Sequence, residues 1–530
     1  MIHLIHDLIT ASAERRASEC ALVCRNERIT YGTLERLVDS TASGLVGAGL
    51  DRGDRVAIYL SKQAENVLGM FGTAKAGGVF VPINPVLKAP QVGHILRDSG
   101  AKVLLTTSDR LASLESVLDC CADLALIVLV DANGTSCSVS TDARVIAWHE
   151  LLEGKGGPLH RVIDIDLASI LYTSGSTGNP KGVVLSHRNM LAGAQSVASY
   201  LENTHSDTLL AVLPFSFDVG FSQLSTAFCT GAKVVLHDYF LPKDVVTVVE
   251  KEEVNCITGV PPLWMQIADQ RWPEAAGSRV RYFANTGGKM PRSLLQRLRG
   301  HFPRAKPYLM YGLTESFRST YLPPEEVDKR PDSIGKAIPN AEILVVHEDG
   351  RLCGAGEPGE LVHRGALVSL GYWNDPERTA VRFKPLPGDG RAGIHTELAV
   401  WSGDIVQMDE EGYLYFIGRK DGMIKTSGYR VSPTEVEEVA FASGLVSEAA
   451  AIGLEDERLG QRIVMVATPI QSATAKTEEL LLFMRGKLPA YMVPAAVEWF
   501  ESLPRNPNGK IDRKALEHQF SSEPESRAVQ

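Results

Sequence analysis

Through most of the chain, short apolar runs alternate with longer segments of helical periodicity. Arg55-Val-Ala-Ile-Tyr-Leu60 is typical of a buried strand, the helical stretch 64–77 follows it, and another apolar run begins at Val79. The segments 102–106 and 124–130 are further candidates for buried strands. Strands that alternate with helices usually form parallel sheets covered by those helices, so this part predicts an α/β fold.

The pattern changes twice further along the chain. Residues 341–372 form short alternating segments interrupted by glycine, which is typical of antiparallel or barrel-like β structure. After Gly418-Arg-Lys-Asp421-Gly the chain becomes a compact α+β segment that continues to about Lys514. A chain of 530 residues is too long for one ordinary core. We therefore expect a large α/β domain over residues 1–420 and a small, mobile α+β domain over residues 421–530.

Composition and charge narrow the classes of protein. With 44% hydrophobic and 22% charged residues the chain has a globular composition, and its net charge of −10 disfavours nucleic acid and anionic membranes as partners. No stretch approaches the roughly 18 apolar residues of a membrane span, and the N-terminus lacks the apolar core of a secretion signal. The eight cysteines are scattered without the spacing of a zinc site or a disulfide scaffold. We expect a cytoplasmic protein.

The segment Leu171-Tyr-Thr-Ser-Gly-Ser-Thr-Gly-Asn-Pro-Lys-Gly182 is the most informative one. It lies between two apolar runs, so we expect a loop between strands. Its glycines let backbone N–H groups approach a polyanion, and Lys181 adds a positive charge for phosphate oxygens. The spacing differs from that of G-x-x-x-x-G-K-[ST], because Pro180 stands at the second glycine position. A flexible Ser/Gly-rich loop is the alternative. The candidate phosphate ligands are Thr173, Ser174, Gly175, Ser176, Thr177, Gly178 and Lys181.

This segment resembles the phosphate-binding signature of the adenylate-forming superfamily. That superfamily includes acyl-CoA synthetases, the adenylation domains of peptide synthetases, and luciferases. Its other signatures follow in the same order over nearly the whole chain. The resemblance implies an enzyme that uses ATP and Mg²⁺ to convert a carboxylic acid into an acyl-adenylate, and then passes the acyl group to a thiol.

Two motifs extend the resemblance to the nucleotide. Tyr311-Gly-Leu-Thr-Glu315 implies that Tyr311 stacks on adenine, that Thr314 contacts the α-phosphate and that Glu315 holds Mg²⁺. An aromatic face suits a purine, and a carboxylate suits a hard cation. In Trp401-Ser-Gly-Asp404, the resemblance makes Asp404 the ligand of the ribose hydroxyls. An aspartate after glycine is otherwise most often a turn residue.

The C-terminal signatures concern domain movement and catalysis. By resemblance, Arg419 also contacts the ribose or a phosphate, and Asp421 is the hinge about which the small domain rotates after adenylation. Lys510 would bridge the substrate carboxylate and the α-phosphate, which offsets both charges and aligns the attack. The alternatives are a charged surface loop around Asp421 and a basic tail around Lys510.

The acid substrate is less defined. Phe217 and Asp218 occupy the superfamily's aromatic motif beside the acyl pocket, where an aspartate in amino-acid-activating members pairs with the α-ammonium group. Asp218 thus indicates an amino acid or amino-bearing acid, unless it caps the following helix. Gly287 and Gly288 resemble the glycine pair that lets the acyl group pass close to the backbone.

The segments 215–223 and 310–339 resemble a narrower subgroup, the exosortase A-associated acyl-CoA ligases of Gram-negative bacteria. In such gene clusters a free acyl carrier protein is the expected thiol acceptor, which suits a chain with no carrier domain after Lys510. An ordinary acyl-CoA synthetase that uses a fatty or aryl acid and CoA is the alternative. A catalytically inactive adenylate-binding scaffold is a more remote one.

Overall fold

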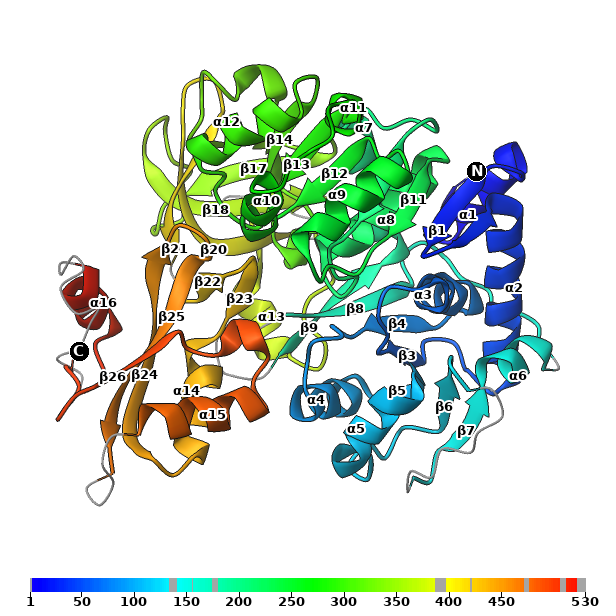
Figure 1. Ribbon diagram of the computed structural model, residues 1–530, viewed down its shortest axis with the longest axis horizontal. Coiled ribbons are helices and arrows are strands. Elements are labelled where there is room, and N and C mark those ends of the chain that lie inside the picture. Colours follow the sequence, from blue (N-terminus) through cyan, green and yellow to red (C-terminus); the bar gives the residue numbers. More distant parts are fainter. Residues whose placement is uncertain are drawn as a thin grey trace, which may run out of the picture.

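The computed structural model describes residues 2–132, 141–154, 156–173, 180–386, 397–419, 422–470, 476–505 and 511–521. Within these ranges, three sheets and their helices form a large body and a smaller body beside it (Figure 1). The chain thus has a large N-terminal α/β part and a small C-terminal α+β part, which confirms the predicted fold class. None of the helices in the described ranges is both long and apolar enough to traverse a bilayer.

The first sheet of the large body has seven strands. They run parallel to their neighbours except for the last pair, β8 and β9, which form an antiparallel hairpin around the predicted phosphate loop. In spatial order the strands are β7 (Arg144–Ala147), β6 (Leu126–Leu129), β5 (Ala101–Thr106), β3 (Arg55–Ile58), β4 (Val79–Pro82), β8 (Leu167–Thr173) and β9 (Lys181–Ser186).

The second sheet is continuous over fourteen strands, with β19 (Phe383–Pro385) placed off the main path beside β20. Strands β1 and β10 to β14 pair in parallel, whereas pairing from β14 through β21 to β17 is antiparallel. The main path is β17 (Ala341–Val346), β18 (Pro358–Gly365), β20 (Leu398–Met408), β21 (Leu414–Arg419), β16 (Ser333–Ala337), β15 (Thr320–Leu322), β14 (Lys306–Tyr311), β13 (Tyr282–Asn285), β12 (Cys256–Gly259), β10 (Thr208–Ala211), β11 (Lys233–Leu236), β1 (Cys20–Cys24) and β2 (Glu27–Thr30).

Helices cover the sheets of the large body, and local sequence fixes their ends. Helix α7 begins after Ser186, whose hydroxyl accepts the backbone N–H of Asn189, and α3 ends at Gly77, which takes a φ of 85°. The helices are α1 (Asp7–Arg16), α2 (Tyr31–Gly47), α3 (Ala64–Ala76), α4 (Ala89–Ser99), α5 (Ser108–Leu118), α6 (Trp148–Glu153), α7 (His187–Tyr200), α8 (Asp218–Thr230), α9 (Pro242–Lys251), α10 (Pro261–Ala268), α11 (Glu274–Arg279), α12 (Arg292–His301), α13 (Pro376–Arg382) and the short η1 (Thr314–Ser316) and η2 (Pro324–Glu326).

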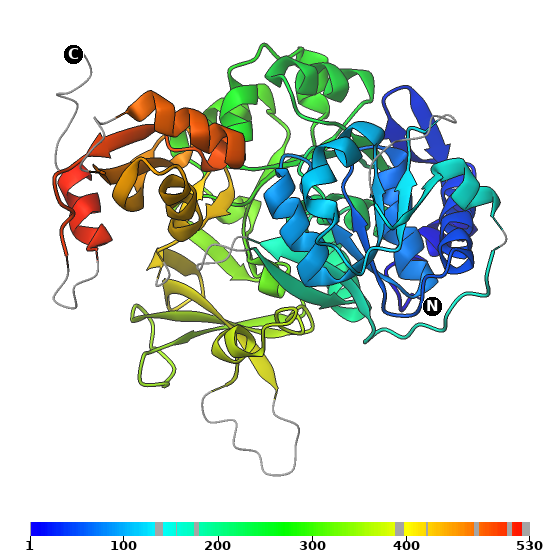
Figure 2. The ribbon, with the colours of Figure 1, turned by 90° about the horizontal axis from the view of Figure 1, so that it is seen from below.

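The small body contains the third sheet, which has five strands. The order is β23 (Tyr429–Val431), β22 (Ile424–Thr426), β25 (Gly460–Pro469) and β24 (Val446–Asp456), with β26 (Ala496–Trp499) also paired to β25. Its helices are α14 (Pro433–Ala442), α15 (Thr477–Lys487), η3 (Ala490–Met492) and α16 (Arg513–Ser521). In both ribbon views α16 lies at the edge farthest from the large body (Figures 1 and 2). The domain boundary expected between residues 420 and 421 falls outside the described residues and stays a prediction.

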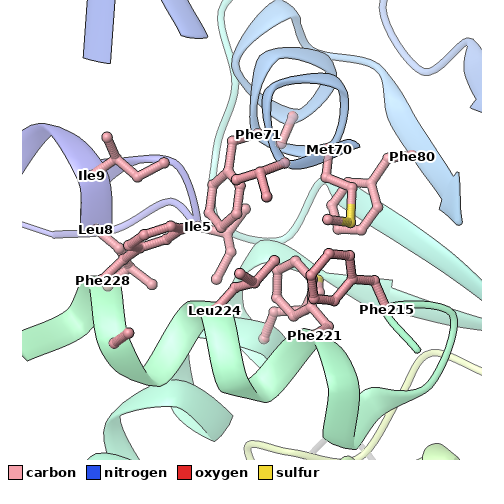
Figure 3. Packing of buried hydrophobic residues seen from close by; sticks show 14 of the residues in the cluster. Ile5, Leu8, Ile9, Met70, Phe71, Phe80, Phe215, Phe221, Leu224 and Phe228 are labelled. Carbon is pink, nitrogen blue, oxygen red and sulfur yellow. The ribbon is translucent and has the colours of Figure 1, made fainter. Parts of the chain in front are cut away.

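A buried aromatic cluster anchors helix α8, whose first residue is Asp218. Phe221 of α8 stacks on Phe71 of α3 and on Phe80 of β4, with ring centroids 5.7 Å and 5.4 Å apart (Figure 3). Phe228 lies further along α8 and meets Phe71 edge-on. Burying a phenylalanine side chain stabilises a fold by about 1.5–3 kcal/mol. The start of α8 is therefore held rigidly between the two sheets of the large body.

Candidate active site

A cavity of about 870 Å³ lies where the large body meets the small body. Its walls come from segments far apart in the chain, including the ends of β8 and β14, the start of α8 and the hairpin β22–β23. The predicted site residues among those that line it are Thr173, Phe217, Asp218, Gly287, Tyr311, Thr314 and Asp404. Sequence reasoning from separate motifs thus converges on one site.

Lys181 and Glu315 meet next to the cavity, each adjacent in the chain to a lining residue, Pro180 and Thr314. The antiparallel register of β8 and β9 pairs Thr173 with Lys181, so both flank the predicted phosphate loop. The Lys181 Nζ lies 3.1 Å from Glu315 Oε1 and 2.6 Å from the hydroxyl of Tyr372. Tyr372 in turn donates to Glu315 Oε1 at 2.7 Å. The lysine is thereby held beside the loop by a buried acceptor and a phenol.

Glu315 is ionised in this environment. Burial alone would raise the pKa of its carboxyl, but the charges of Lys181 and Arg382 lower that pKa to about 2. Its second oxygen, Oε2, is buried and has no hydrogen-bond partner within the described part of the chain. The same ranges hold no group of three or more His, Cys, Asp or Glu side chains suited to a metal. One carboxylate with a free oxygen fits Mg²⁺, which takes its other ligands from phosphates and water.

Tyr311 and Asp404 come together from strands β14 and β20. The Tyr311 hydroxyl donates to Asp404 Oδ2, and Asp404 itself is 4% exposed. Gly403 has a φ of 71°, a conformation that favours glycine, and this turn directs Asp404 into the cavity. Across the β20–β21 ladder Asp404 lies opposite Arg419, so the two predicted nucleotide contacts are neighbours in register.

Asp218 has a partner that the sequence motifs did not predict. It is the first residue of α8, and the N-cap position of that helix is occupied by Phe217, so Asp218 is not the capping residue. Its Oδ2 forms an ion pair with Nη1 of Arg318, and its Oδ1 accepts the hydroxyl of Thr314 at 3.3 Å. Arg318 follows Phe317, a fully buried residue with a positive φ of 57°, and this unusual backbone turns the guanidinium inward.

Gly287 and Phe217, two of the residues predicted to lie beside the acyl group, line the cavity. Gly287 lines it with a φ of 76°, and a Cβ there would come within 3.0 Å of Val260. Gly288 is absent from the described lining, and its carbonyl instead accepts the amide of Asn285. Phe217 meets Tyr429 of the small body edge-on, with ring centroids 5.3 Å apart.

Several predicted residues lie outside the described ranges. They are Ser174, Gly175, Ser176, Thr177 and Gly178 of the phosphate loop, the expected hinge Asp421 and the expected catalytic Lys510. Sequence reasoning missed two residues of the site: Tyr372, for which the sequence carries no local signal, and Arg318. A single charge within the small and aromatic run Ser316-Phe-Arg-Ser-Thr320 was the available signal for Arg318, since an arginine in a buried run needs a partner.

Comparison with known proteins finds matches over most of the chain. The model of the family described as AMP-binding enzyme matches residues 9–373, and that of the AMP-binding enzyme C-terminal domain matches residues 435–510. The long-chain-fatty-acid–CoA ligase FadD13 of Mycobacterium tuberculosis is 31% identical over 93% of this chain and 94% of its own length.

Two further relatives differ from FadD13 in kind, one being a bacitracin synthase and the other a CoA synthetase of known structure. Bacitracin synthase 1 of Bacillus licheniformis is 30% identical over 97% of this chain, which spans only 9% of that much longer protein. A structure of o-succinylbenzoate CoA synthetase (MenE) from Bacillus subtilis, a double mutant bound with the product analogue OSB-NCoA, superposes with a TM-score of 0.80 at 25% identity, covering 98% of each chain.

Proposed function

Because the chain belongs to the AMP-binding enzyme family, we propose that it is an ATP-dependent, AMP-forming ligase that activates a carboxylic acid and passes the acyl group to a thiol. In the first step a carboxylate oxygen attacks the α-phosphorus of ATP, and the bond to pyrophosphate breaks. In the second step the thiol sulfur attacks the acyl carbon of the adenylate, AMP leaves with the bonding pair, and the thiol proton is released.

One observation carries this proposal. Lys181, Glu315 and Tyr372 gather beside the loop between β8 and β9, and the neighbouring cavity is lined by the Tyr311–Asp404 pair. The first group suits a polyphosphate, because a lysine beside phosphate oxygens offsets their charge. The second suits a nucleoside, with an aromatic face for adenine and a carboxylate for the ribose hydroxyls. Thr314 is assigned to the α-phosphate, and Thr173 with Ser174 to Gly178 to the β- and γ-phosphates.

Mg²⁺ belongs to the proposal as well. Glu315 would hold the ion through its free Oε2, and the ion would neutralise charge on the transferring phosphate. Lys181 already pairs with the other carboxylate oxygen, so the carboxylate keeps a fixed orientation when the nucleotide arrives.

The small domain is assigned a part in both steps, and a hinge around Asp421 connects it to the large domain. Residues 1–420 would form the adenylating domain and residues 421–530 the mobile one, which carries Lys510. The cavity wall contributed by Gly428, Tyr429 and Arg430 supports a state in which the thiol-transfer face is turned toward the acyl site. Arg505, five residues before Lys510, pairs with Glu448 on β24 and bridges to Ile511, which precedes the peripheral α16. Adenylation would then require the small domain to rotate.

The acceptor is assigned by its chemistry to a phosphopantetheine thiol, which CoA and acyl carrier proteins share. The resemblance to exosortase A-associated ligases favours a free acyl carrier protein, whereas the match to FadD13 over almost its full length favours CoA. The amino-acid interpretation depends on Asp218 as a free carboxylate, and its ion pair with Arg318 removes that support. An acid without an amino group is therefore the substrate class proposed here.

Substrate-dependent ATP–pyrophosphate exchange tests the first step without any acceptor. The panel contains fatty, aryl and amino acids, and exchange above the background without acid is the expected result. A second assay offers the acid that gives the strongest exchange to CoA and to a pantetheinylated carrier protein and measures thioester by mass spectrometry. Binding of ATP without exchange for any acid would instead favour the inactive scaffold.

A further inference from the structure

The Asp218–Arg318 pair lines the cavity at a largely buried position, next to Phe217 of the predicted acyl site. The side chains of Asp218 and Arg318 are 12% and 3% exposed, and both line the cavity. Each carboxylate oxygen already has a partner, since Oδ2 pairs with the guanidinium and Oδ1 accepts from Thr314. Arg318 Nη1 also donates to the carbonyl of Phe317 at 2.7 Å, which fixes the guanidinium to the backbone. The ion pair is therefore held in place by hydrogen bonds on both the carboxylate and the guanidinium side.

This arrangement cancels the charge that an amino-acid substrate needs. An α-ammonium group leaves water only if a buried anion replaces its hydration. Asp218 stands where that anion is expected, but its charge is already balanced by Arg318. An incoming ammonium would meet a second cation within the same pair, and repulsion between like charges at a buried position strongly disfavours binding.

The other carboxylates along the described cavity wall do not replace Asp218. Asp238 lies 3.9 Å from the ammonium of Lys62, and Asp269 is in an ion pair at an exposed position. Asp404 accepts the hydroxyl of the tyrosine assigned to adenine. Burial and a neighbouring glutamate raise the pKa of Glu435 to about 8, so this group is mostly protonated at neutral pH.

We propose that Arg318 is a specificity-determining residue that neutralises Asp218 and thereby selects carboxylic acids without an α-ammonium group. This inference rests on the proposed adenylating function and names its substrate class. Arg318 contributes from a chain position 100 residues after Asp218. A sequence that keeps the aspartate of amino-acid-activating relatives can for that reason have the opposite preference.

The test uses pairs of acids that share a skeleton and differ only at the α-carbon. ATP–pyrophosphate exchange is measured for 4-methylpentanoate against leucine, 3-phenylpropanoate against phenylalanine, and dodecanoate against 2-aminododecanoate. For every skeleton that gives exchange, the wild-type enzyme should favour the amino-free acid by at least about a hundredfold in kcat/KM, as expected for an uncompensated buried charge. Preference for the amino acid in any such pair overturns the inference.

Two variants separate charge from packing. Arg318→Met removes the cation at similar side-chain volume and exposes Asp218, so the preference for the amino-free acid should fall by at least about tenfold. The double variant Arg318→Met with Asp218→Asn is neutral again and should return to the wild-type preference, and it avoids the unpaired buried aspartate that could prevent folding. If both variants lose activity toward both acids with an unchanged ratio, Arg318 is structural and the inference fails. Absence of exchange with every acid in the wild type would contradict the proposed adenylation itself.

Discussion

The proposed nucleotide end and the proposed acyl end of the site differ in how their charged side chains are paired. At the nucleotide end, Lys181 pairs with only one oxygen of Glu315, and the other oxygen stays available to a cation. At the acyl end, both oxygens of Asp218 are occupied by Arg318 and Thr314. The first end keeps charges ready for a polyanion and its metal, whereas the second has cancelled the charge it contains.

The difference follows from what each end must bind. The proposed nucleotide end takes ATP with Mg²⁺, and apart from Tyr372 the residues assigned to it sit inside recognisable motifs. The acid varies between relatives, and selectivity at that end depends on which groups remain uncompensated. Several of the variants below change one end only, and each shows whether the property assigned to the other end stays the same.

The largest loss is expected for Lys510→Ala. The lysine is assigned to both the substrate carboxylate and the α-phosphate, and losing such a contact should lower the adenylation rate by at least about a hundredfold. Single-turnover formation of acyl-AMP measures this step directly. Lys487→Ala, an exposed lysine on the same small domain, is the matched control. A near-normal rate for Lys510→Ala would remove this residue from the catalytic role.

Tyr372→Phe should have the next largest effect. The variant removes the hydroxyl that bonds both Lys181 and Glu315, and losing hydrogen bonds to charged groups should cost about tenfold or more in kcat/KM for ATP. The ratio between amino-free and amino acids should not change, because the acyl end is untouched. Tyr321→Phe, at a partly buried position that stacks on Tyr200 against the core of the large body, serves as the control. A changed acid preference in Tyr372→Phe would show that the two ends are coupled.

Asp421→Pro tests the proposed hinge that serves both ends. Restricting the backbone there should slow thioester formation by about tenfold while acyl-AMP formation changes less. The free enzyme can reach the adenylating arrangement before the substrates are mixed, whereas the rotation that precedes thioester formation must occur after the adenylate has formed. Rapid-quench measurement of the two half-reactions on one enzyme preparation gives the comparison. Equal losses in both half-reactions would argue against a hinge at this position.

The smallest effect is expected for Glu435→Gln, on the small-domain wall of the cavity. Burial, together with Glu438, raises the pKa of Glu435 to about 8, well above its value in the unfolded chain. Between these two pKa values the unfolded chain loses the proton and the folded chain keeps it, so wild-type stability falls as pH rises toward 8. Glu435→Gln should melt a few °C (about 1–3 °C) above the wild type at pH 8.5 and close to it at pH 5.

Differential scanning fluorimetry at both pH values measures this shift. Glu478→Gln, an exposed residue of α15, should show no such pH dependence. An equal change in melting temperature at the two pH values would mean that Glu435 ionises normally in the folded protein.

Sequence alone predicted the fold class, and residues singled out in several separate motifs line one cavity in the structure. Strand β3, helix α3 and strand β4 occur where the apolar periodicity places them, because buried runs of this length have few alternatives. The acyl end resisted prediction for a physical reason. The effective charge of Asp218 is set by Arg318, and only the folded backbone around Phe317 brings these two side chains together. Tyr372 was missed for the same reason, since its backbone bridges to Val183 only in the folded protein.

The pairing of Asp404 with Arg419 across β20 and β21 has a mechanical consequence. Strand β21 ends at Arg419, and the first strand of the small sheet begins at Ile424. The proposed nucleotide site therefore lies close to the hinge about which the small domain would turn. When a domain rotates, residues close to the hinge move little and residues far from the hinge move a long way. The bound acyl-adenylate would then stay almost in place, while rotation of the small domain brings different surfaces of that domain to it.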